Sequence, residues 1–324
     1  MKKNRKSFHS KTVHNDSNLF VDDHDVLKKN WSCAQVISRF GEQADLSFNH
    51  QIYRCHIRKH NVDLTVGDWV YFQQDNDQDM PVIEKIKKRK NELYRIDQYH
   101  RKKTIVANVD KVCIVIAVEP QFSMLNIDKY LINMEYYHLP VMIIVNKIDL
   151  ITQEQLNALK EELKIYQDIG YQILYLSIHK PDTLIALQQY LEKNITIFIG
   201  QSGVGKSSIV NQFIHHPPQK TQQLSENNKL GQHTTTVSRL FYLSSQGGII
   251  DSPGIRDFLP IALSPKDILN GYIELQQYAY HCKFRDCQHQ NESGCAVQSA
   301  LKEGKISQIR IDNLLKIIKQ IHNT

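Results

Sequence analysis

The sequence lacks a long hydrophobic run. Its longest uninterrupted apolar stretches, such as Val112–Val118 and Val141–Val145, have the length of buried strands and fall far short of the ~18 residues of a membrane helix. The N-terminus is polar and basic and has no apolar segment of the kind that secretory signals carry. We therefore expect no membrane segment, and the chain is predicted to be cytoplasmic and monomeric.

Cysteine is scarce, with six residues in 324, and three of the six lie between positions 282 and 295. This distribution does not suit a secreted disulfide framework, and in a reducing compartment clustered thiols more often bind a metal. The spacing Cys282-x4-Cys287-x-His289-x5-Cys295 offers three thiolates and one imidazole, the donor set of a closed tetrahedral Zn²⁺ site. One structural zinc ion is therefore predicted. His281 is the alternative imidazole ligand, and scattered reduced cysteines are the alternative interpretation.

Residues 1–15 contain no acidic residue and form a first basic segment. The whole chain carries a net charge of +6 and has a pI near 8.8. A second basic segment, residues 85–103, holds nine Lys or Arg residues against Glu92 and Asp97. Such clusters supply phosphate contacts in nucleic-acid-binding proteins, so both segments predict an RNA surface, with solvated faces as the alternative. The nine are Lys85, Lys87, Lys88, Arg89, Lys90, Arg95, Arg101, Lys102 and Lys103.

Length and pattern divide the chain into an arm and three domains. Residues 1–30 are polar and without periodicity, which predicts a flexible basic arm. Residues 31–95 consist of short segments in which apolar and polar residues alternate, as in half-buried strands. About five short strands favour an oligonucleotide-binding (OB) barrel that binds RNA, with an SH3-like barrel as the alternative. The segments include Ala34–Phe40, Gln51–Ile57, Trp69–Gln73 and Pro81–Ile86.

From residue 96 to residue 260, buried apolar strands alternate with helical stretches, which predicts a mostly parallel sheet covered by helices on both faces. Residues 261–324 are expected to form a helical zinc-binding domain with helices Ser264–Tyr280 and Lys305–Ile321. The fold class is thus multidomain α/β with an N-terminal all-β OB-type barrel. Expected strands are Val112–Val118, Val141–Val145, Ile173–Leu176, Ile195–Ile199, Val237–Leu243 and Gly248–Ile250; expected helices are Ile127–His138, Gln153–Ile169, Asp182–Glu192 and Lys206–Ile214.

One strand, Ile195–Ile199, leads directly into a glycine-rich loop that matches GxxxxGK[ST] and opens a helix. Glycines let the backbone wrap closely around phosphate oxygens, whose charge meets converging N–H groups and the helix N-terminus. Lys206 is expected to reach the β and γ phosphates, and the Ser207 hydroxyl to bind Mg²⁺. The loop comprises Gly200, Gln201, Ser202, Gly203, Val204, Gly205, Lys206, Ser207 and Ser208.

A second motif, Asn146-Lys147-Ile148-Asp149 (NKxD), follows the strand that ends at Val145 and is predicted to read the base. A carboxylate there accepts hydrogen bonds from guanine N1–H and the N2 amino group, donors that adenine lacks in that arrangement. The motif therefore predicts GTP rather than ATP, with the stem of Lys147 against the ring. Ser177 is a candidate for the loop that closes over the base, although the two residues after it depart from the usual Ala-Lys.

Two further elements are expected to read the γ-phosphate and Mg²⁺. In Asp251-Ser252-Pro253-Gly254 (DxxG), Asp251 would hold Mg²⁺ through water and the Gly254 N–H would sense the γ-phosphate. Among Thr234–Thr236, Thr235 is favoured as the Mg²⁺ ligand. The glutamine that orients the attacking water in many GTPases is missing, because Ile255 stands in its place. Hydrolysis is therefore expected to be slow and to need a partner; His233 is a candidate water-orienting group, with a plain surface histidine as the alternative.

The order of these motifs is rotated. In an ordinary GTP-binding domain the phosphate loop precedes the base-reading motif, whereas here the base reader comes first, which predicts a circularly permuted GTPase. With GQSGVGKSS at 200–208, GQHTTT at 231–236, DSPGIR at 251–256 and the terminal Cys/His group, the chain resembles the ribosome small-subunit-dependent GTPase family (RsgA, also called YjeQ) over about residues 31–320. Gln232 stands where Arg is common and Ser252 where Thr is common, and neither change removes a group that the chemistry needs.

The resemblance implies an enzyme that binds the small (30S) ribosomal subunit late in its maturation and hydrolyses GTP to GDP and phosphate under stimulation by the subunit. It further implies that the barrel contacts ribosomal RNA. The two basic segments agree with RNA binding, because they offer phosphate contacts. The missing glutamine agrees with stimulation by the subunit, because hydrolysis then needs an external activator. The alternative is a nucleotide-gated rRNA-binding assembly factor for another ribosomal particle, with incidental hydrolysis.

Overall fold

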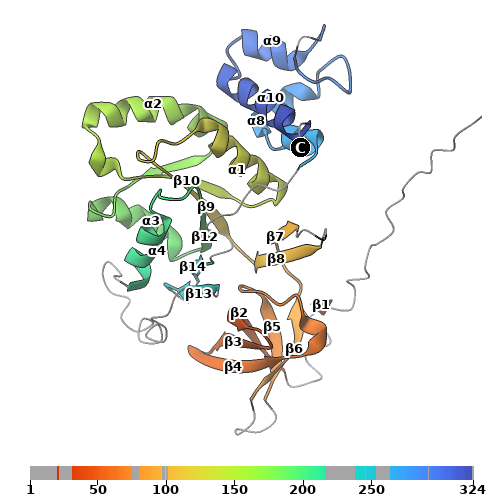
Figure 1. The fold of residues 1–324 in the computed structure, drawn as a ribbon, viewed down its shortest axis with the longest axis vertical. Helices are drawn as coiled ribbons and strands as arrows, with labels where there is room; N and C mark the ends of the chain where they lie inside the picture. Colours follow the sequence, from red (N-terminus) through yellow and green to blue (C-terminus); the bar gives the residue numbers. More distant parts are fainter. Residues whose placement is uncertain are drawn as a thin grey trace, which may run out of the picture.

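In the computed structural model the chain forms a barrel, a sheet covered by helices and a helical cluster, which follow one another from bottom to top in Figure 1. The structure describes residues 20–21, 31–74, 80–96, 99, 101–215, 238–244, 246–252, 263–290 and 292–322. Of the predicted arm, the short strand β1 (Phe20–Val21), which pairs with the barrel, lies within these ranges. None of the described helices combines the length and apolar character that a bilayer crossing requires.

The barrel consists of five strands: β2 (Ser32–Phe40), β3 (Gln43–Phe48), β4 (Gln51–Ile57), β5 (Trp69–Gln73) and β6 (Val82–Lys87). Strand β2 pairs with β3 and β5, β3 pairs with β4, and β6 closes the ring by pairing with β4 and β5. Alternate side chains point inward, so that the interior is apolar. The all-β barrel predicted for this part is confirmed. Its fully buried residues include Val36, Leu46, Cys55, Val70 and Ile83.

A β-hairpin that the sequence pattern did not predict lies between the barrel and the α/β sheet (Figure 1). Its strands, β7 (Glu92–Ile96) and β8 (Lys102–Ala107), pair in antiparallel fashion. Tyr137 Oη donates a hydrogen bond of 2.8 Å to the carbonyl of Tyr94, which attaches the hairpin to the α/β part. The many lysines and arginines of residues 85–103 obscure the alternation of apolar and polar residues that would predict these strands. The domain boundary predicted after residue 95 falls inside β7.

The α/β sheet has the strand order β13-β14-β12-β9-β10-β11. Neighbouring strands are parallel except β13 and β14, which confirms the predicted mostly parallel sheet. At the edge, β13 also pairs with barrel strand β2, through Arg239 and Ser38, so that the barrel and the sheet are hydrogen-bonded. The strands are β9 (Lys111–Ala117), β10 (Val141–Asn146), β11 (Gln172–Tyr175), β12 (Ile195–Ile199), β13 (Arg239–Tyr242) and β14 (Gly248–Asp251).

Helices cover both faces of this sheet, as predicted. One apolar cluster contains residues of α1 and α2, and a second cluster contains residues of α3 and α4; neighbouring strand residues, such as Cys113 and Ile114, belong to opposite clusters. Thr152 caps α2 in a capping box, and Gly170 ends the helix with a φ of 112°. The helices are α1 (Met124–Tyr136), α2 (Gln153–Ile169), α3 (Ile185–Leu191) and α4 (Lys206–His215); short 3₁₀ turns span Lys59–Asn61, Ile148–Leu150 and Pro181–Leu184.

The C-terminal part consists of α7 (Pro265–Asn270), α8 (Ile273–Ala279), α9 (Ala296–Lys302) and α10 (Gln308–His322). The single helix predicted over Ser264–Tyr280 is wrong, because the structure has two helices separated at Gly271. A Cβ on Gly271 would lie 2.7 Å from the Cα of Ile132 on α1. Glycine is a poor helix former, so the break at Gly271 agrees with local helix propensity, and the missing side chain lets the chain pack closely against α1.

A buried ion pair attaches the helical part to the α/β part. The side chains of Asp128 on α1 and Arg310 on α10 are 0% and 1% exposed, and the guanidinium donates to Asp128 and to Glu274. Asp128 also accepts hydrogen bonds from Tyr166 (2.7 Å) and Asn313 (2.8 Å). A charge is tolerated in the interior when it is paired and hydrogen-bonded, so these contacts specify how α10 sits on α1.

We predict that Arg310→Met lowers the free energy of unfolding by about 3–5 kcal/mol, because the Asp128 carboxylate then stays buried without its cation. The double variant Asp128→Asn/Arg310→Met should recover part of this loss. Lys316→Ala, which changes an exposed residue of the same helix, should stay within about 0.5 kcal/mol of the wild type. Urea denaturation followed by circular dichroism measures all three, and a wild-type midpoint for Arg310→Met would contradict the prediction.

Candidate functional site

The carboxyl ends of three parallel strands bring the two nucleotide motifs together. Strand β9 lies between β10 and β12, and its residue Ile114 aligns with Ile143 on one side and Ile199 on the other. Because all three strands run in the same direction, Asn146 at the end of β10 and Gly200 after β12 emerge at one edge of the sheet. In open α/β sheets, ligands bind outside this edge.

The loop from Gly200 to Lys206 has a backbone that suits glycine. The φ angles of Gly200, Gly203 and Gly205 are 144°, 81° and 93°, which L side chains rarely adopt. Lys206 Nζ donates to the carbonyls of Gly200 (2.7 Å) and Gln201 (2.8 Å), so its ammonium points into the loop. The loop lies at the N-terminus of α4, where free backbone N–H groups and the helix dipole attract anions.

Hydrogen bonds join the base-reading motif to this loop. Asn146 Nδ2 donates to the carbonyl of Val204 (2.9 Å), a buried contact across 58 residues of sequence, and Lys147 Nζ donates to the carbonyl of Gly203 (2.9 Å). Because the Asn146 side chain lies this close to the loop, position 205 requires glycine: a Cβ there would lie 2.3 Å from Asn146 Nδ2. The motif therefore holds the glycine loop in place in addition to any contact with a base.

Two buried oxygen atoms at this edge of the sheet lack a hydrogen-bond donor among the described residues. Asp149 Oδ1 and Asn146 Oδ1 are buried, and no described residue donates a hydrogen bond to either atom. A hydrogen bond from Ser177 lowers the pKa of Asp149, with burial acting in the opposite direction, so the carboxylate is ionised at neutral pH. An unsatisfied buried acceptor costs about 1–3 kcal/mol. Their placement indicates a ligand that offers hydrogen-bond donors.

Ser177 is fully buried just after β11. Its loop is held by hydrogen bonds to Thr183, which the sequence analysis did not single out. Thr183 Oγ1 accepts a hydrogen bond from the Ser177 N–H (3.0 Å) and donates to the carbonyl of Lys180 (2.6 Å). Ser177 Oγ in turn accepts from the His179 N–H (3.0 Å). No motif marks Thr183, because its role arises from the way the loop folds back on itself.

The end of β14 contributes the remaining described candidates. Asp251 lines a small cavity together with Lys206 and Ser207, so the structure brings the DxxG aspartate to the glycine loop. Ser238 Oγ donates to Ser252 Oγ (2.6 Å) beside it. The other predicted phosphate-sensing residues lie outside the described residues: His233, Thr234–Thr236, Gly254 and Ile255.

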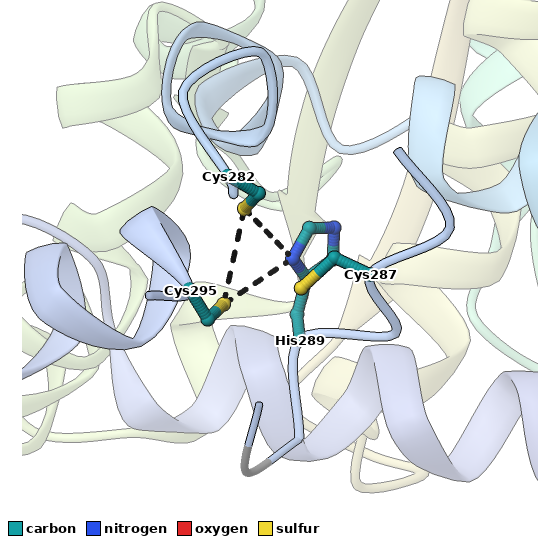
Figure 2. A group of neighbouring side chains, drawn as sticks. All are labelled: Cys282, Cys287, His289 and Cys295. Atoms are coloured by element: carbon teal, nitrogen blue, oxygen red, sulfur yellow. Dashed lines mark hydrogen bonds between the residues drawn. The ribbon is translucent and has the colours of Figure 1, made fainter. Parts of the chain in front are cut away.

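Three cysteines and one histidine converge between α8 and α9 (Figure 2). Sγ of Cys282 and Sγ of Cys295 lie 3.6 and 3.5 Å from His289 Nδ1 and 3.9 Å from each other, and all four ligand atoms, including that of Cys287, lie within 4.8 Å. A tetrahedral site with Zn–S bonds of ~2.3 Å needs about 3.8 Å between ligand sulfurs. Burial lowers the pKa of His289, which favours the neutral imidazole that a metal binds. His281 is not part of the group.

Comparison with known proteins identifies the family. A family model described as RsgA GTPase matches residues 86–259. The chain is 40% identical over 322 residues to the small ribosomal subunit biogenesis GTPase RsgA of Haemophilus influenzae (strain PittGG), covering 98% of this chain and 93% of that one. It belongs to the RsgA GTPase family. Against the RsgA of Actinobacillus pleuropneumoniae serotype 5b the identity is 42% over 293 residues, or 89% and 85% of the two chains.

Solved structures show the same architecture as this RsgA-family chain. The crystal structure of YloQ, a circularly permuted GTPase, matches with a TM-score of 0.72 and 25% identity over 91% of this chain and 96% of that one. YjeQ from Thermotoga maritima matches with a TM-score of 0.73 and 27% identity over 91% and 99%. The predicted circular permutation and the predicted class of enzyme, a GTP hydrolase, are confirmed.

Proposed function

We propose that this RsgA-family GTPase binds the small (30S) ribosomal subunit, acts late in its maturation and hydrolyses GTP to GDP and phosphate when the subunit stimulates it. The names of the curated relatives support the small subunit as the partner. The observation that carries the assignment of the nucleotide site is the pair of buried acceptors on Asn146 and Asp149, hydrogen-bonded through Asn146 to the glycine loop. We further propose a cytoplasmic monomer.

The base is proposed to lie between Asn146, Asp149 and the loop of Ser177. The Asp149 carboxylate can accept from guanine N1–H and the N2 amino group, which would satisfy its orphaned oxygen. The aliphatic stem of Lys147 lies against the ring in this pose. Ser177, held by Thr183, restricts the base from the other side. Adenine would leave Asp149 Oδ1 without a hydrogen-bond donor and is disfavoured.

The phosphates are proposed to lie in the glycine loop, residues 200–208. The Lys206 ammonium, which now donates to loop carbonyls, would donate to the β and γ phosphates, and backbone N–H groups of the loop would bind the remaining oxygens. Ser207 and Asp251 fit Mg²⁺, because a hydroxyl and a carboxylate line one cavity at the phosphate end. When bound, the ion neutralises charge on the β and γ phosphates. Thr235 as an Mg²⁺ ligand, Gly254 as the γ-phosphate sensor and His233 as the water-orienting group complete the proposal.

The Cys282, Cys287, His289 and Cys295 group is proposed to hold one structural zinc ion. The fit rests on the donor set and on ligand spacings close to a tetrahedron. All four positions are filled by protein atoms, so the site has no open position for catalysis. Its role would be to join α8 and α9 across a connecting loop that carries few apolar side chains of its own.

The test of the function is the GTPase rate with and without partners. We predict that purified small subunits raise the rate at least tenfold, whereas large subunits and free rRNA leave it near the intrinsic value, because the glutamine that orients water is absent and an activator must replace it. Ser207→Ala should abolish the Mg²⁺-dependent stimulation. If large subunits stimulate more strongly, or if Ser207→Ala still supports subunit maturation in cells, the coupled small-subunit function fails and the alternative of an rRNA-binding factor with incidental hydrolysis is favoured.

Exchange of the base reader gives the second prediction. Asp149→Asn should weaken GDP binding by about 100-fold and favour xanthosine diphosphate, because an amide can donate to the extra carbonyl oxygen of xanthine where the carboxylate cannot. Titration with fluorescent guanine and xanthosine nucleotides measures both affinities. The matched control Asp182→Asn, an exposed residue on the neighbouring turn, should leave both unchanged. An unaltered preference for guanine in Asp149→Asn would refute this base site.

The metal gives the third prediction. Elemental analysis should find one zinc per chain, and Cys295→Ser should reduce this content severalfold and lower the unfolding temperature of the helical part. Cys113→Ser, a buried cysteine of the sheet core, is the control that should retain the zinc. A wild-type chain purified without metal chelators that contained no zinc would contradict the site.

A further inference from the structure

A cavity of about 670 Å³ opens where the barrel, the β7–β8 hairpin and the edge of the α/β sheet meet. Its walls are the barrel loop 62–66 with Arg39 and Gly41, the β7–β8 hairpin, and Ser238 and Ser252 at the ends of β13 and β14. The cavity is separate from the small one that Lys206 and Ser207 line, although Ser252 borders both. A ligand in it would contact the barrel, the hairpin and the strand end next to Asp251.

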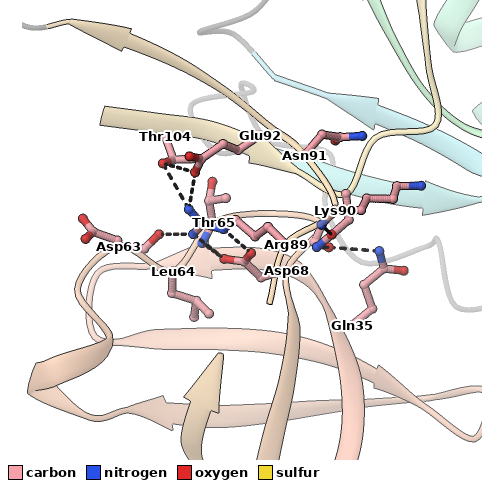
Figure 3. A network of polar contacts seen from close by, with 12 residues as sticks. Gln35, Asp63, Leu64, Thr65, Asp68, Arg89, Lys90, Asn91, Glu92 and Thr104 are labelled. Carbon is pink, nitrogen blue, oxygen red and sulfur yellow. Dashed lines mark hydrogen bonds and ion pairs between the residues drawn. The ribbon is translucent and has the colours of Figure 1, made fainter. Parts of the chain in front are cut away.

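Most basic residues around this cavity are already engaged. Arg89 is 9% exposed and donates to Asp68, which is fully buried, and to Glu92 (Figure 3). The RNA-surface role predicted for Arg89 is therefore wrong, since its charge compensates a buried carboxylate. Lys102 pairs with the same Glu92, and the Arg39 guanidinium donates to backbone carbonyls of the barrel loop. These cations hold the protein together.

Two cations of the hairpin differ from the others. Arg95 and Lys103 both line the cavity, both are exposed, and they stand directly opposite each other in the β7–β8 register. Like charges in such a cross-strand pair destabilise a hairpin. Among the described residues no acidic side chain forms an ion pair with either one, and Asp63 is the single described acid in the lining. A repulsive pair that faces a cavity indicates an anionic ligand that relieves the repulsion.

The rest of the lining suits phosphate esters. Thr65, Thr104, Ser238 and Ser252 also line the cavity, and hydroxyl groups together with Arg and Lys make up the usual set of phosphate contacts in nucleic-acid interfaces. Three of these hydroxyls already donate to protein acceptors, which leaves the Ser252 hydroxyl as the donor that a ligand could use. A drug-like ligand site of this volume would be mostly apolar. The apolar members Val62, Leu64, Val66 and Ile105 come from the barrel loop and β8, whereas the charged groups gather on the hairpin.

We propose that this cavity binds the sugar-phosphate backbone of RNA, with Arg95 and Lys103 as its phosphate contacts, and that RNA held there touches the strand ends beside the nucleotide site. The inference rests on the proposed function, because the RNA would be that of the bound small subunit. It assigns the RNA contact to two residues of the hairpin rather than to the whole basic segment 85–103. It also places an RNA ligand within reach of Ser252, which is next to the proposed Mg²⁺ residue Asp251.

The decisive variant is Arg95→Gln/Lys103→Gln in the full chain. At ~0.15 M salt it should bind purified small subunits about tenfold more weakly, and the slope of log affinity against log salt should fall by about 1.5, as expected for two lost phosphate contacts. The subunit concentration that half-saturates GTP hydrolysis should rise by the same factor. Intrinsic hydrolysis without subunits should not change. The melting temperature should stay equal or rise, because the cross-strand repulsion is removed.

Two controls separate charge at this place from charge in general. Lys160→Gln/Lys164→Gln removes two exposed cations from α2, and it should leave affinity and salt slope unchanged. Arg95→Lys/Lys103→Arg keeps both charges in the hairpin and should bind nearly as the wild type does. Equal affinity and equal slope for the wild type and Arg95→Gln/Lys103→Gln would overturn the inference.

Free phosphate is the other source of the same chemistry. If the cavity bound inorganic phosphate instead of RNA, millimolar phosphate at constant ionic strength would raise the melting temperature of the wild type but not that of Arg95→Gln/Lys103→Gln. The wild type and this variant would then bind small subunits equally. That result also overturns the inference. A wild type that bound small subunits without faster hydrolysis would defeat the proposed function instead. The binding comparison would still decide whether the cavity holds RNA.

Discussion

The position of β9 between β10 and β12 is the constraint on which the nucleotide site depends. Parallel pairing on both sides aligns the strand ends, so the base-reading motif and the glycine loop leave the sheet at the same edge although the chain visits them in rotated order. The buried hydrogen bond from Asn146 to Val204 then fixes the distance between them. Circular permutation changes which loop is cut, but it leaves this alignment intact, because strand order in space does not require a particular order in sequence.

Much of this site could be predicted from sequence because its signals are local. A strand followed by a glycine loop and a helix, or a capping box such as that of Thr152, is determined by neighbouring residues, and α2 begins and ends where its sequence indicates. The cysteine spacing likewise gathers its ligands within one short loop. Each of these predictions follows from a few adjacent residues together with the fold class, and none requires knowledge of distant contacts.

The features that escaped prediction depend on distant contacts. Gly271 lies between two helices and packs closely against Ile132, which is far away in sequence. Arg89 looks like one more surface cation until the barrel brings the buried Asp68 to it. The sequence pattern did not predict the hairpin β7–β8 for the same reason, since its residue Glu92 pairs with Lys102 across the two strands and with Arg89. Thr183 carries no motif, and its contact with Ser177 exists because the loop returns on itself.

The junctions between the three parts are formed by different elements, and this decides how each part is connected to the nucleotide site. Separating α10 from α1 would break the Asp128–Arg310 ion pair and its hydrogen bonds from Tyr166 and Asn313. It would also remove Ile132 of α1 from the apolar cluster of the helical part. The barrel is joined to the sheet at the edge strand β13 by the pairing of Arg239 with Ser38 and by the hydrogen bond that Tyr242 Oη donates to Gln35, and barrel residue Ile37 packs in the apolar cluster of the sheet. Strands β13 and β14 flank the phosphate end of the site. A change at that end therefore has a direct path to the barrel and the hairpin through these two strands, whereas α1 carries the zinc-binding helices along with the sheet.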